Sequence, residues 1–147
     1  MHQMLEGKVV VVTGGASGIG RSIAIRAAAH GARAVIVGDL VETPREGGAP
    51  TGEAVTAAGA AFTFRGTDVS KQADIAALLA AADEFGGVDV MVCNAGIAIE
   101  GDGPELPEKD YRRLLAVDLD GAYFSARSAG LRMRELGKAG SVILISS

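Results

Sequence analysis

Four valines at residues 9–12 lead directly into a glycine-containing turn, and a helical pattern follows that turn at once. Glycines recur there at Gly14, Gly18 and Gly20. Glycine adopts a positive φ without strain and lets a ligand approach the backbone closely. The free N–H groups and the positive end of the following helix attract phosphate. The order of strand, glycine turn and helix therefore predicts a site for nucleotide phosphates, with a tight structural turn as the alternative interpretation.

Apolar runs typical of strands alternate with helical patterns along the chain. Strands are predicted over residues 8–13, 34–37, 61–65, 88–92 and 141–146. Helices are predicted over 18–30 and over 53–58, and a further helix begins after an N-cap at Ser70. The longest helix is predicted over 108–136, where apolar residues form one continuous stripe. Such alternation implies a parallel sheet covered by helices on both faces. No internal repeat is present, so we expect one α/β domain over residues 1–147.

The composition argues against several classes of protein. A net charge of −4 without a basic block argues against nucleic acid as a partner. No apolar run approaches the roughly 20 residues that span a membrane, and the N-terminus lacks the pattern of a signal peptide. Cys93 is the single cysteine, so an intrachain disulfide is excluded. Its place at the end of a buried strand favours the role of a small apolar side chain in the core over that of a nucleophile. We therefore expect a cytoplasmic protein without a metal site.

Asp39 lies 19 residues after Gly20, at the carboxyl end of the strand 34–37. A carboxylate there can accept hydrogen bonds from the hydroxyls of an adenosine ribose, and it would repel a 2′-phosphate. Neither Ser17 nor Leu40 offers a positive charge nearby. The pattern therefore favours NAD(H) over NADP(H). A solvated loop aspartate stays open as the alternative, because Arg45 follows in the next loop.

Polar residues also follow two other strands. Asp68 and Val69 come after the strand 61–65, and Asn94, Ala95 and Gly96 come after the strand 88–92. Open parallel sheets bind ligands at the carboxyl ends of their strands. We expect Asp68 to accept a hydrogen bond from an adenine amino group while Val69 packs on the ring. Each of the two groups alone is more often a turn or a helix cap, and it is their combination with the glycine turn that indicates a binding site.

These motifs together, with Cys93-Asn94-Ala95-Gly96-Ile97 and the serine-ended strand 141–147, resemble the short-chain dehydrogenase/reductase family along the whole chain. The resemblance implies a Rossmann-type doubly wound sheet in three α/β/α layers, of strand order 3-2-1-4-5, that continues to strands 6 and 7 in complete members. It implies an NAD(P) cofactor, an alcohol or ketone substrate, and a homodimer or homotetramer. It also implies that Asn94 holds its strand beside the valine strand. It implies a dinucleotide site formed by Gly14, Ser17, Gly18, Ile19, Gly20, Asp39, Leu40, Asp68, Val69, Asn94, Ala95, Gly96 and Val117.

Two departures from the family pattern concern catalysis. Asp118 stands where the family has a catalytic asparagine that supports a proton relay near a helix distortion, and an ionised aspartate only accepts hydrogen bonds. An aspartate on a helix surface is the competing interpretation. Ser147 matches the family's catalytic serine, but the Tyr-x-x-x-Lys motif is not found, because neither Tyr111 nor Tyr123 has a lysine four residues later. The tyrosine of that motif is the family's general acid–base.

The sequence therefore leaves more than one function open. The first is an NAD-dependent oxidoreductase of which this chain is the cofactor-binding part. The others are a catalytically silent nucleotide-binding protein and an NADP-dependent protein similar to 3-oxoacyl reductases. The strand 141–146 would be an apolar open edge, so we expect the natural chain to continue beyond Ser147 or to be half of an assembly.

Overall fold

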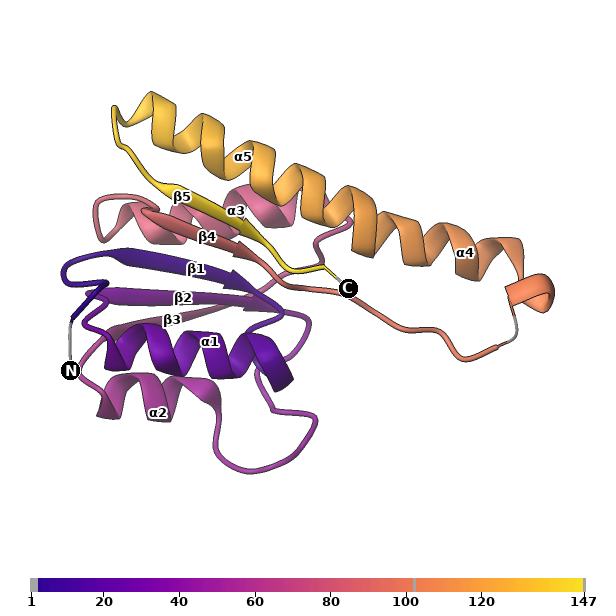
Figure 1. Cartoon of the computed structure of the whole chain (residues 1–147), viewed down its shortest axis with the longest axis horizontal. Helices are drawn as coiled ribbons and strands as arrows, with labels where there is room; N and C mark the ends of the chain where they lie inside the picture. Colours follow the sequence, from indigo (N-terminus) through magenta and orange to yellow (C-terminus); the bar gives the residue numbers. More distant parts are fainter. Residues whose placement is uncertain (1–2, 102, 147) are drawn as a thin grey trace.

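The computed structural model describes residues 3–101 and 103–146. The strands in this part of the chain form one parallel sheet in the order β3-β2-β1-β4-β5 (Figure 1). They are β1 (Val9–Thr13), β2 (Ala34–Asp39), β3 (Ala61–Gly66), β4 (Val90–Cys93) and β5 (Ser141–Leu144). The predicted Rossmann-type sheet and its strand order are thus confirmed, with β1 at the centre.

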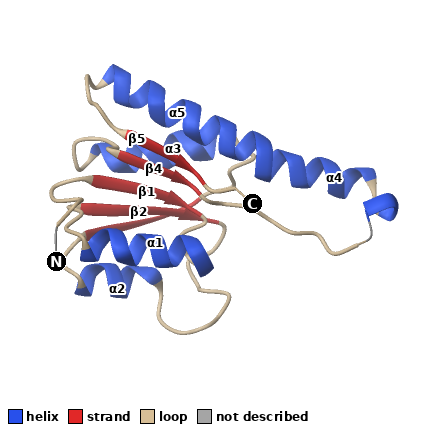
Figure 2. Cartoon of the chain, in the orientation of Figure 1, coloured by secondary structure: helices blue, strands red, loops and turns tan. Residues whose placement is uncertain are grey.

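Helices cover both faces of the sheet, as Figure 2 shows. On one face lie α1 (Gly18–Ala29) and α2 (Thr51–Ala57), and on the other lie α3 (Gln72–Asp83) and α5 (Ala122–Glu135). Two hydrophobic clusters fill the spaces between these layers. The predicted three-layer arrangement is therefore confirmed, and each layer boundary has its own core.

The valines of β1 serve both cores because side chains alternate along a strand. Val9 and Val11 pack toward α3 and α5, whereas Val10 and Val12 pack toward α1. None of these four side chains is more than 1% exposed. Burial of a valine contributes about 1.5 to 3 kcal/mol, so this strand anchors the sheet and holds the following turn in place.

The predicted helix over 108–136 is interrupted, and this prediction is corrected. It consists of α4 (Glu108–Leu115), a π-helical turn η2 (Ala116–Gly121) and α5. The helix approaches Val69 so closely at Gly121 that a Cβ there would lie 2.6 Å from a Val69 methyl group. A π-helical turn adds a residue and rotates the helix face by about 100°. The apolar stripe is broken accordingly, because Leu119 is 59% exposed while Met133 is buried.

Most element boundaries differ from the predicted ones by one or two residues, as at β4, which covers Val90–Cys93 rather than 88–92. Three of the differences involve α2, α3 and β5. The helix α2 begins at Thr51 rather than at residue 53, and the Thr51 hydroxyl donates to the carbonyl of Gly15 at 3.0 Å. Lys71, not Ser70, is the N-cap of α3, because the Ser70 hydroxyl donates to Asp68 at 2.6 Å. The strand β5 ends at Leu144 rather than at residue 146.

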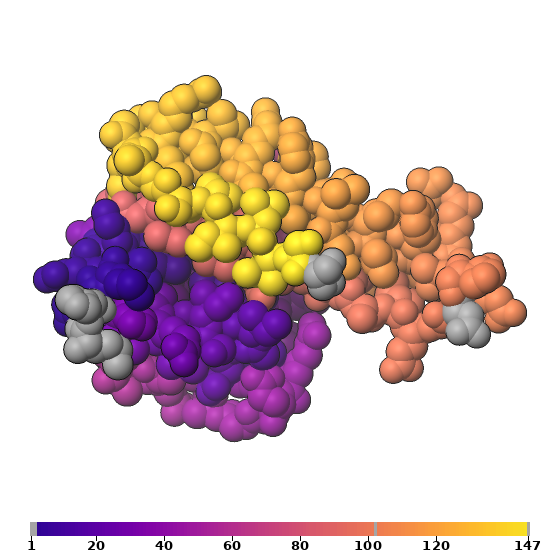
Figure 3. Space-filling view, viewed as in Figure 1, coloured from indigo at the N-terminus to yellow at the C-terminus, as the bar shows by residue number. Residues whose placement is uncertain are grey.

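Two parts of the described chain have little cover. The strand β5 forms an edge of the sheet as predicted, and Ile143, Leu144 and Ile145 are 41–55% exposed. The helix α4 has no buried residue and projects from the body of the molecule (Figure 3). No described helix is long and apolar enough to cross a membrane.

Candidate functional site

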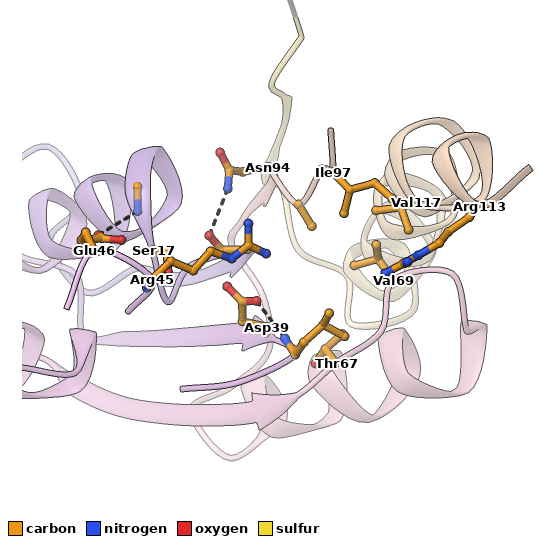
Figure 4. A pocket seen from close by; sticks show the side chains of 16 residues that line it. Ser17, Asp39, Arg45, Glu46, Thr67, Val69, Asn94, Ile97, Arg113 and Val117 are labelled. Atoms are coloured by element: carbon orange, nitrogen blue, oxygen red, sulfur yellow. Dashed lines mark hydrogen bonds between the residues drawn. The ribbon is translucent and has the colours of Figure 1, made fainter. Parts of the chain in front are cut away.

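A cleft of about 310 Å³ lies at the carboxyl ends of β1, β2, β3 and β4 (Figure 4). That volume is at the lower end of the range for ligand pockets. Its position is where open parallel sheets bind ligands, at the point where the strand order reverses. The cleft is lined by Gly14, Ser17, Gly18, Gly38, Asp39, Leu40, Arg45, Glu46, Thr67, Val69, Asn94, Ala95, Gly96, Ile97, Arg113 and Val117.

The glycine turn between β1 and α1 needs its glycines for different reasons. Gly14 has φ +68°, and a Cβ there would lie 2.9 Å from the Cα of Ala95. Gly20 is buried, and a Cβ there would collide with the carbonyl oxygen of Gly14. Gly18 has φ +54° and no described atom within 4 Å of a Cβ, so a ligand can approach it from that side, although its N–H donates to Glu46. This open position at the N-terminus of α1 fits the phosphates of a dinucleotide.

A hydrogen-bond network joins the ends of β1 and β4. The side-chain amide of Asn94 donates to the carbonyls of Thr13 and Gly14, both at 3.1 Å. The Thr13 hydroxyl accepts from the backbone N–H groups of Asn94 and Ala95 at 3.0 and 3.1 Å. Asn94 thus holds β4 beside β1, as the family resemblance implied. The network also fixes Ala95 and Gly96 as one wall of the cleft.

Asp39 lies at the end of β2 and turns toward the glycine turn. Its carboxylate accepts from the backbone N–H of Ala16 at 3.0 Å and from that of Leu40 at 2.8 Å. The residue is partly exposed and lines the cleft (Figure 4). A carboxylate held in this way presents a fixed negative charge to any ligand beside the turn.

Not every predicted binding residue reaches the cleft. Asp68 does not line it, because its carboxylate accepts from the hydroxyl and the N–H of Ser70. The Ser70 hydroxyl, with Lys71 nearby, holds the pKa of Asp68 below its usual value, although burial opposes this. Ile19 is 66% exposed on α1 and Gly20 lies beneath the turn, so neither lines the cleft. Ser147 lies outside the described residues.

Asp118 is in the π-helical turn, and its role is visible in one contact. Its Oδ1 accepts from the backbone N–H of Ile97 at 2.8 Å. This bond joins η2 to the segment that follows β4. Val117, the preceding residue, lines the cleft. The Asp118 carboxylate thus holds the cleft wall at Ile97, and the catalytic role that the resemblance implied for Asp118 stays a prediction.

Replacing Asp118 by alanine is expected to loosen that wall. Removing one hydrogen bond of this kind lowers the free energy of unfolding by about 1 kcal/mol. The amide of Ile97, which donates to Asp118, should exchange with solvent faster in the variant when followed by NMR. Asp118→Asn keeps an acceptor oxygen and is the matched control, with protection at Ile97 close to that of the wild type. Equal exchange in all three proteins would contradict this role.

Six residues that line the cleft were not among the predicted site residues: Gly38, Arg45, Glu46, Thr67, Ile97 and Arg113. Gly38 and Ile97 directly adjoin predicted site residues. Thr67 directly follows β3, so the strand-end rule that found Val69 could have found it as well. Arg113 lies four residues before Val117 and therefore on the same helix face, so the prediction of Val117 as a site residue could have been extended to Arg113. The positions of Arg45 and Glu46 depend on the path of a loop, and no spacing in the sequence indicates that path.

Cys93, the single cysteine of the sequence, does not line the cleft. Cys93 is buried within β4, and burial raises the pKa of its thiol to about 11. This agrees with an apolar filler rather than a nucleophile. Among residues 3–101 and 103–146, no group of three or more His, Cys, Asp or Glu side chains is arranged to hold a metal ion.

Comparison with known proteins agrees with this architecture. The chain is 38% identical over 145 residues to an L-rhamnose 1-dehydrogenase (NAD(P)(+)) from Azotobacter vinelandii, covering 98% of this chain and 57% of that protein. It is 34% identical to an NADP-dependent (R)-specific alcohol dehydrogenase from Lentilactobacillus kefiri, covering 100% of this chain and 57% of that protein.

A solved structure of a short-chain type dehydrogenase/reductase from Mycobacterium marinum superposes with a TM-score of 0.89 at 26% identity, over 99% of this chain and 57% of that one. The chain thus spans somewhat more than half the length of its relatives. The family model described as short chain dehydrogenase matches residues 8–147. With its Rossmann-type sheet and its glycine turn, the chain belongs to the short-chain dehydrogenase family.

Proposed function

We propose that this chain is the NAD-binding part of an oxidoreductase that transfers hydride between a nicotinamide cofactor and an alcohol or ketone. The observation that carries the proposal is the cleft, in which the N-terminus of α1 and the Asp39 carboxylate lie side by side. The relatives named above include dehydrogenases of a sugar and of an alcohol, and they support this class of substrate.

Each part of the cleft would hold a different part of the dinucleotide. The N–H groups of the glycine turn would bind the pyrophosphate, and Asp39 would accept from the adenosine ribose. Val69 would pack on the adenine ring, while Asn94, Gly96 and Val117 would line the way toward the nicotinamide. The nicotinamide, when bound, supplies the hydride donor or acceptor. Ser147 would hydrogen-bond the substrate oxygen. We further propose a single domain, a homodimer or homotetramer, and a cytoplasmic location.

Titration calorimetry of the purified protein with NAD⁺ and NADH tests this proposal. Binding of both with one site per chain is expected, because the residues that face the cleft come from one chain. Adenosine alone should bind more weakly, since it lacks the phosphates that the glycine turn attracts. No heat and no fluorescence change with either dinucleotide would contradict the proposal. Binding without any oxidation of alcohols by the natural full-length protein would favour the catalytically silent alternative.

The choice between the two dinucleotides rests on the Asp39 charge. NAD⁺ is expected to bind about tenfold or more tightly than NADP⁺, because a carboxylate beside a 2′-phosphate is repulsive. Asp39→Asn keeps an acceptor for Ala16 but removes the charge, so the Kd for NADP⁺ should fall about tenfold while that for NAD⁺ changes little. Glu42→Gln, an exposed charge in the same region, is the matched control. A preference for NADP⁺ in the wild type would contradict this prediction.

Arg45 is the observation that favours an NADP-dependent alternative. It lines the cleft, and Figure 4 shows its side chain extending across the opening beside Asp39. A guanidinium there could bind a 2′-phosphate. Arg45→Ala separates the two interpretations, because it weakens NADP⁺ binding alone if Arg45 contacts that phosphate.

A further inference from the structure

The segment between β2 and α2, here called the strap (residues 40–50), runs across the phosphate-binding end of α1. It reaches that end through three hydrogen bonds. The backbone N–H of Arg45 donates to the Ser17 hydroxyl at 2.8 Å, and the N–H of Gly18 donates to the Glu46 carboxylate at 3.0 Å. The Arg21 guanidinium donates to the carbonyl of Ala49 at 3.1 Å. Figure 4 shows Glu46 beside Ser17 at the mouth of the cleft.

Glu46 uses the same donor that a dinucleotide phosphate would need. Gly18 has an open backbone at the N-terminus of α1, and its N–H points at the Glu46 Oε1. The carboxylate is a charge-assisted acceptor at the positive end of a helix, which is the position that favours a phosphate oxygen. One N–H cannot serve both anions at full strength. The bound carboxylate and a bound phosphate therefore compete.

The electrostatics of Glu46 agree with an anion in this position. The Gly18 N–H holds the pKa of Glu46 below its usual value, with smaller contributions from Arg21 and Ser17. The residue is thus ionised at neutral pH. A phosphate that approached Gly18 would meet this negative charge, because the Gly18 N–H already donates to Glu46. Displacement of Glu46 must therefore accompany phosphate binding rather than follow it.

The backbone next to Glu46 can change conformation without moving the strands of the sheet. Gly47 and Gly48 follow directly, with φ of +79° and +88° and no described atom within 4 Å of a Cβ at either. Glycines permit such a backbone to change conformation at little steric cost. Residues on either side of Glu46 are held in place, because Pro44 within the strap is buried and Thr51 just after it donates to the carbonyl of Gly15. The Glu46 segment can therefore swing away while its flanks stay in place.

We propose that Glu46 is an internal competitor for the dinucleotide phosphates, and that the strap must release it for the cofactor phosphates to bind the Gly18 N–H. This inference rests on the proposed function, because it assigns a control element to the same cleft. The strap lowers the apparent affinity for any ligand that carries a phosphate at this position. It leaves ligands without phosphate unaffected, since they do not need the Gly18 N–H.

Calorimetric titration of wild type, Glu46→Ala and Glu42→Ala with NAD⁺ tests the competition. Glu46→Ala is expected to lower the Kd about three- to tenfold, because the fraction of protein with a free Gly18 N–H rises. Glu42→Ala removes an equal charge from the same strap without a described contact to the glycine turn, and its Kd should match the wild type. The Kd for adenosine should be the same in all three proteins. Equal gains in both variants, or no gain in Glu46→Ala, would overturn the inference.

The amide of Gly18 gives a readout that needs no nicotinamide. In the wild type without ligand its NMR shift should follow the titration of Glu46, and in Glu46→Ala it should not. Inorganic pyrophosphate should shift this amide in both proteins, at a lower concentration in Glu46→Ala. If pyrophosphate behaves so while NAD⁺ does not bind, the proposed function fails and the competition stands. A Gly18 amide that is indifferent to both pH and pyrophosphate in the wild type overturns the competition itself.

Discussion

Replacing Gly20 by alanine is expected to lower the free energy of unfolding by about 3 kcal/mol and to abolish dinucleotide binding. The new methyl group would collide with the carbonyl oxygen of Gly14 and approach the Asn94 amide to 2.5 Å. Both partners are fixed, because Asn94 joins β4 to the turn. Forced overpacking costs about 1 to 3 kcal/mol, and the upper end applies where backbone must move. Urea unfolding followed by circular dichroism measures the loss, and titration with NAD⁺ measures the binding.

Gly130→Ala is the matched control for this glycine. Gly130 lies in α5, is exposed, and has no described atom within 4 Å of a Cβ. The same chemical change there should raise the stability by about 0.5 to 1 kcal/mol, because alanine favours a helix. Opposite signs for the two variants would separate the packing effect from the helix preference. An unchanged unfolding midpoint in Gly20→Ala would show that the turn relaxes around a methyl group.

The second large effect is expected at Asp89, at the end of the sheet opposite the cleft. Its carboxylate accepts from the Val9 N–H at 2.8 Å and pairs with the Lys138 ammonium at 3.0 Å, while its backbone bonds to Val9 and Ser141. Asp89→Ala removes the charge and leaves Lys138 with only the carbonyls of Gly86 and Gly87. Loss of one partner of a buried pair costs about 3 kcal/mol or more, and partial exposure of Lys138 places the value near 2 to 3 kcal/mol.

The stability that Asp89 contributes is expected to depend on pH, and the direction follows from the pKa of its carboxyl group. Burial raises the pKa of Asp89, but the Val9 N–H and the Lys138 ammonium together lower it by more. The pKa of Asp89 therefore lies below its usual value of 3.8. A lowered pKa stabilises the fold above the unfolded value, and this stabilisation is lost as the pH falls through the folded one. The difference between wild type and Asp89→Ala should therefore be largest above about pH 4 and shrink in more acidic urea titrations.

Asp120→Ala is the control, since Asp120 is exposed in η2 and makes no hydrogen bond or ion pair with the described residues. Its stability should stay within about 0.5 kcal/mol of the wild type. Binding of NAD⁺ to Asp89→Ala, measured where that variant is folded, should be unchanged because the cleft lies at the opposite ends of the strands. A gap between Asp89→Ala and wild type that is constant down to pH 2 would contradict the role of its charge.

Local sequence signals were sufficient for much of the fold. The valine run and the other apolar segments predicted the strands, because a buried parallel strand needs apolar residues on both faces. The strand order came only from the family resemblance, since periodicity within a strand says nothing about its neighbours. The apolar stripe over 108–136 did not predict the π-helical turn at its middle, and only the family resemblance implied a helix distortion near Asp118.

The candidate site was predictable where a residue's position follows from its strand. Asp39, Val69 and Asn94 line the cleft because each lies at or shortly after the carboxyl end of a parallel strand. Asp68 shares that position but turns its carboxylate to Ser70, a local hydrogen bond that competes with ligand binding. Glu46 was missed because its contact with Gly18 spans 28 residues and depends on a loop whose conformation glycine leaves open.

The central place of β1 has a consequence for how the protein is made. Val10 pairs with Val35 of β2 on one side and with Val90 of β4 on the other, and Val90 is synthesised eighty residues after Val10. At about 5 to 20 residues per second, one edge of the valine strand waits roughly 4 to 16 seconds for its partner. Nascent chains therefore expose their most apolar segment early, and chaperone capture during synthesis should favour chains shorter than about 90 residues over longer ones.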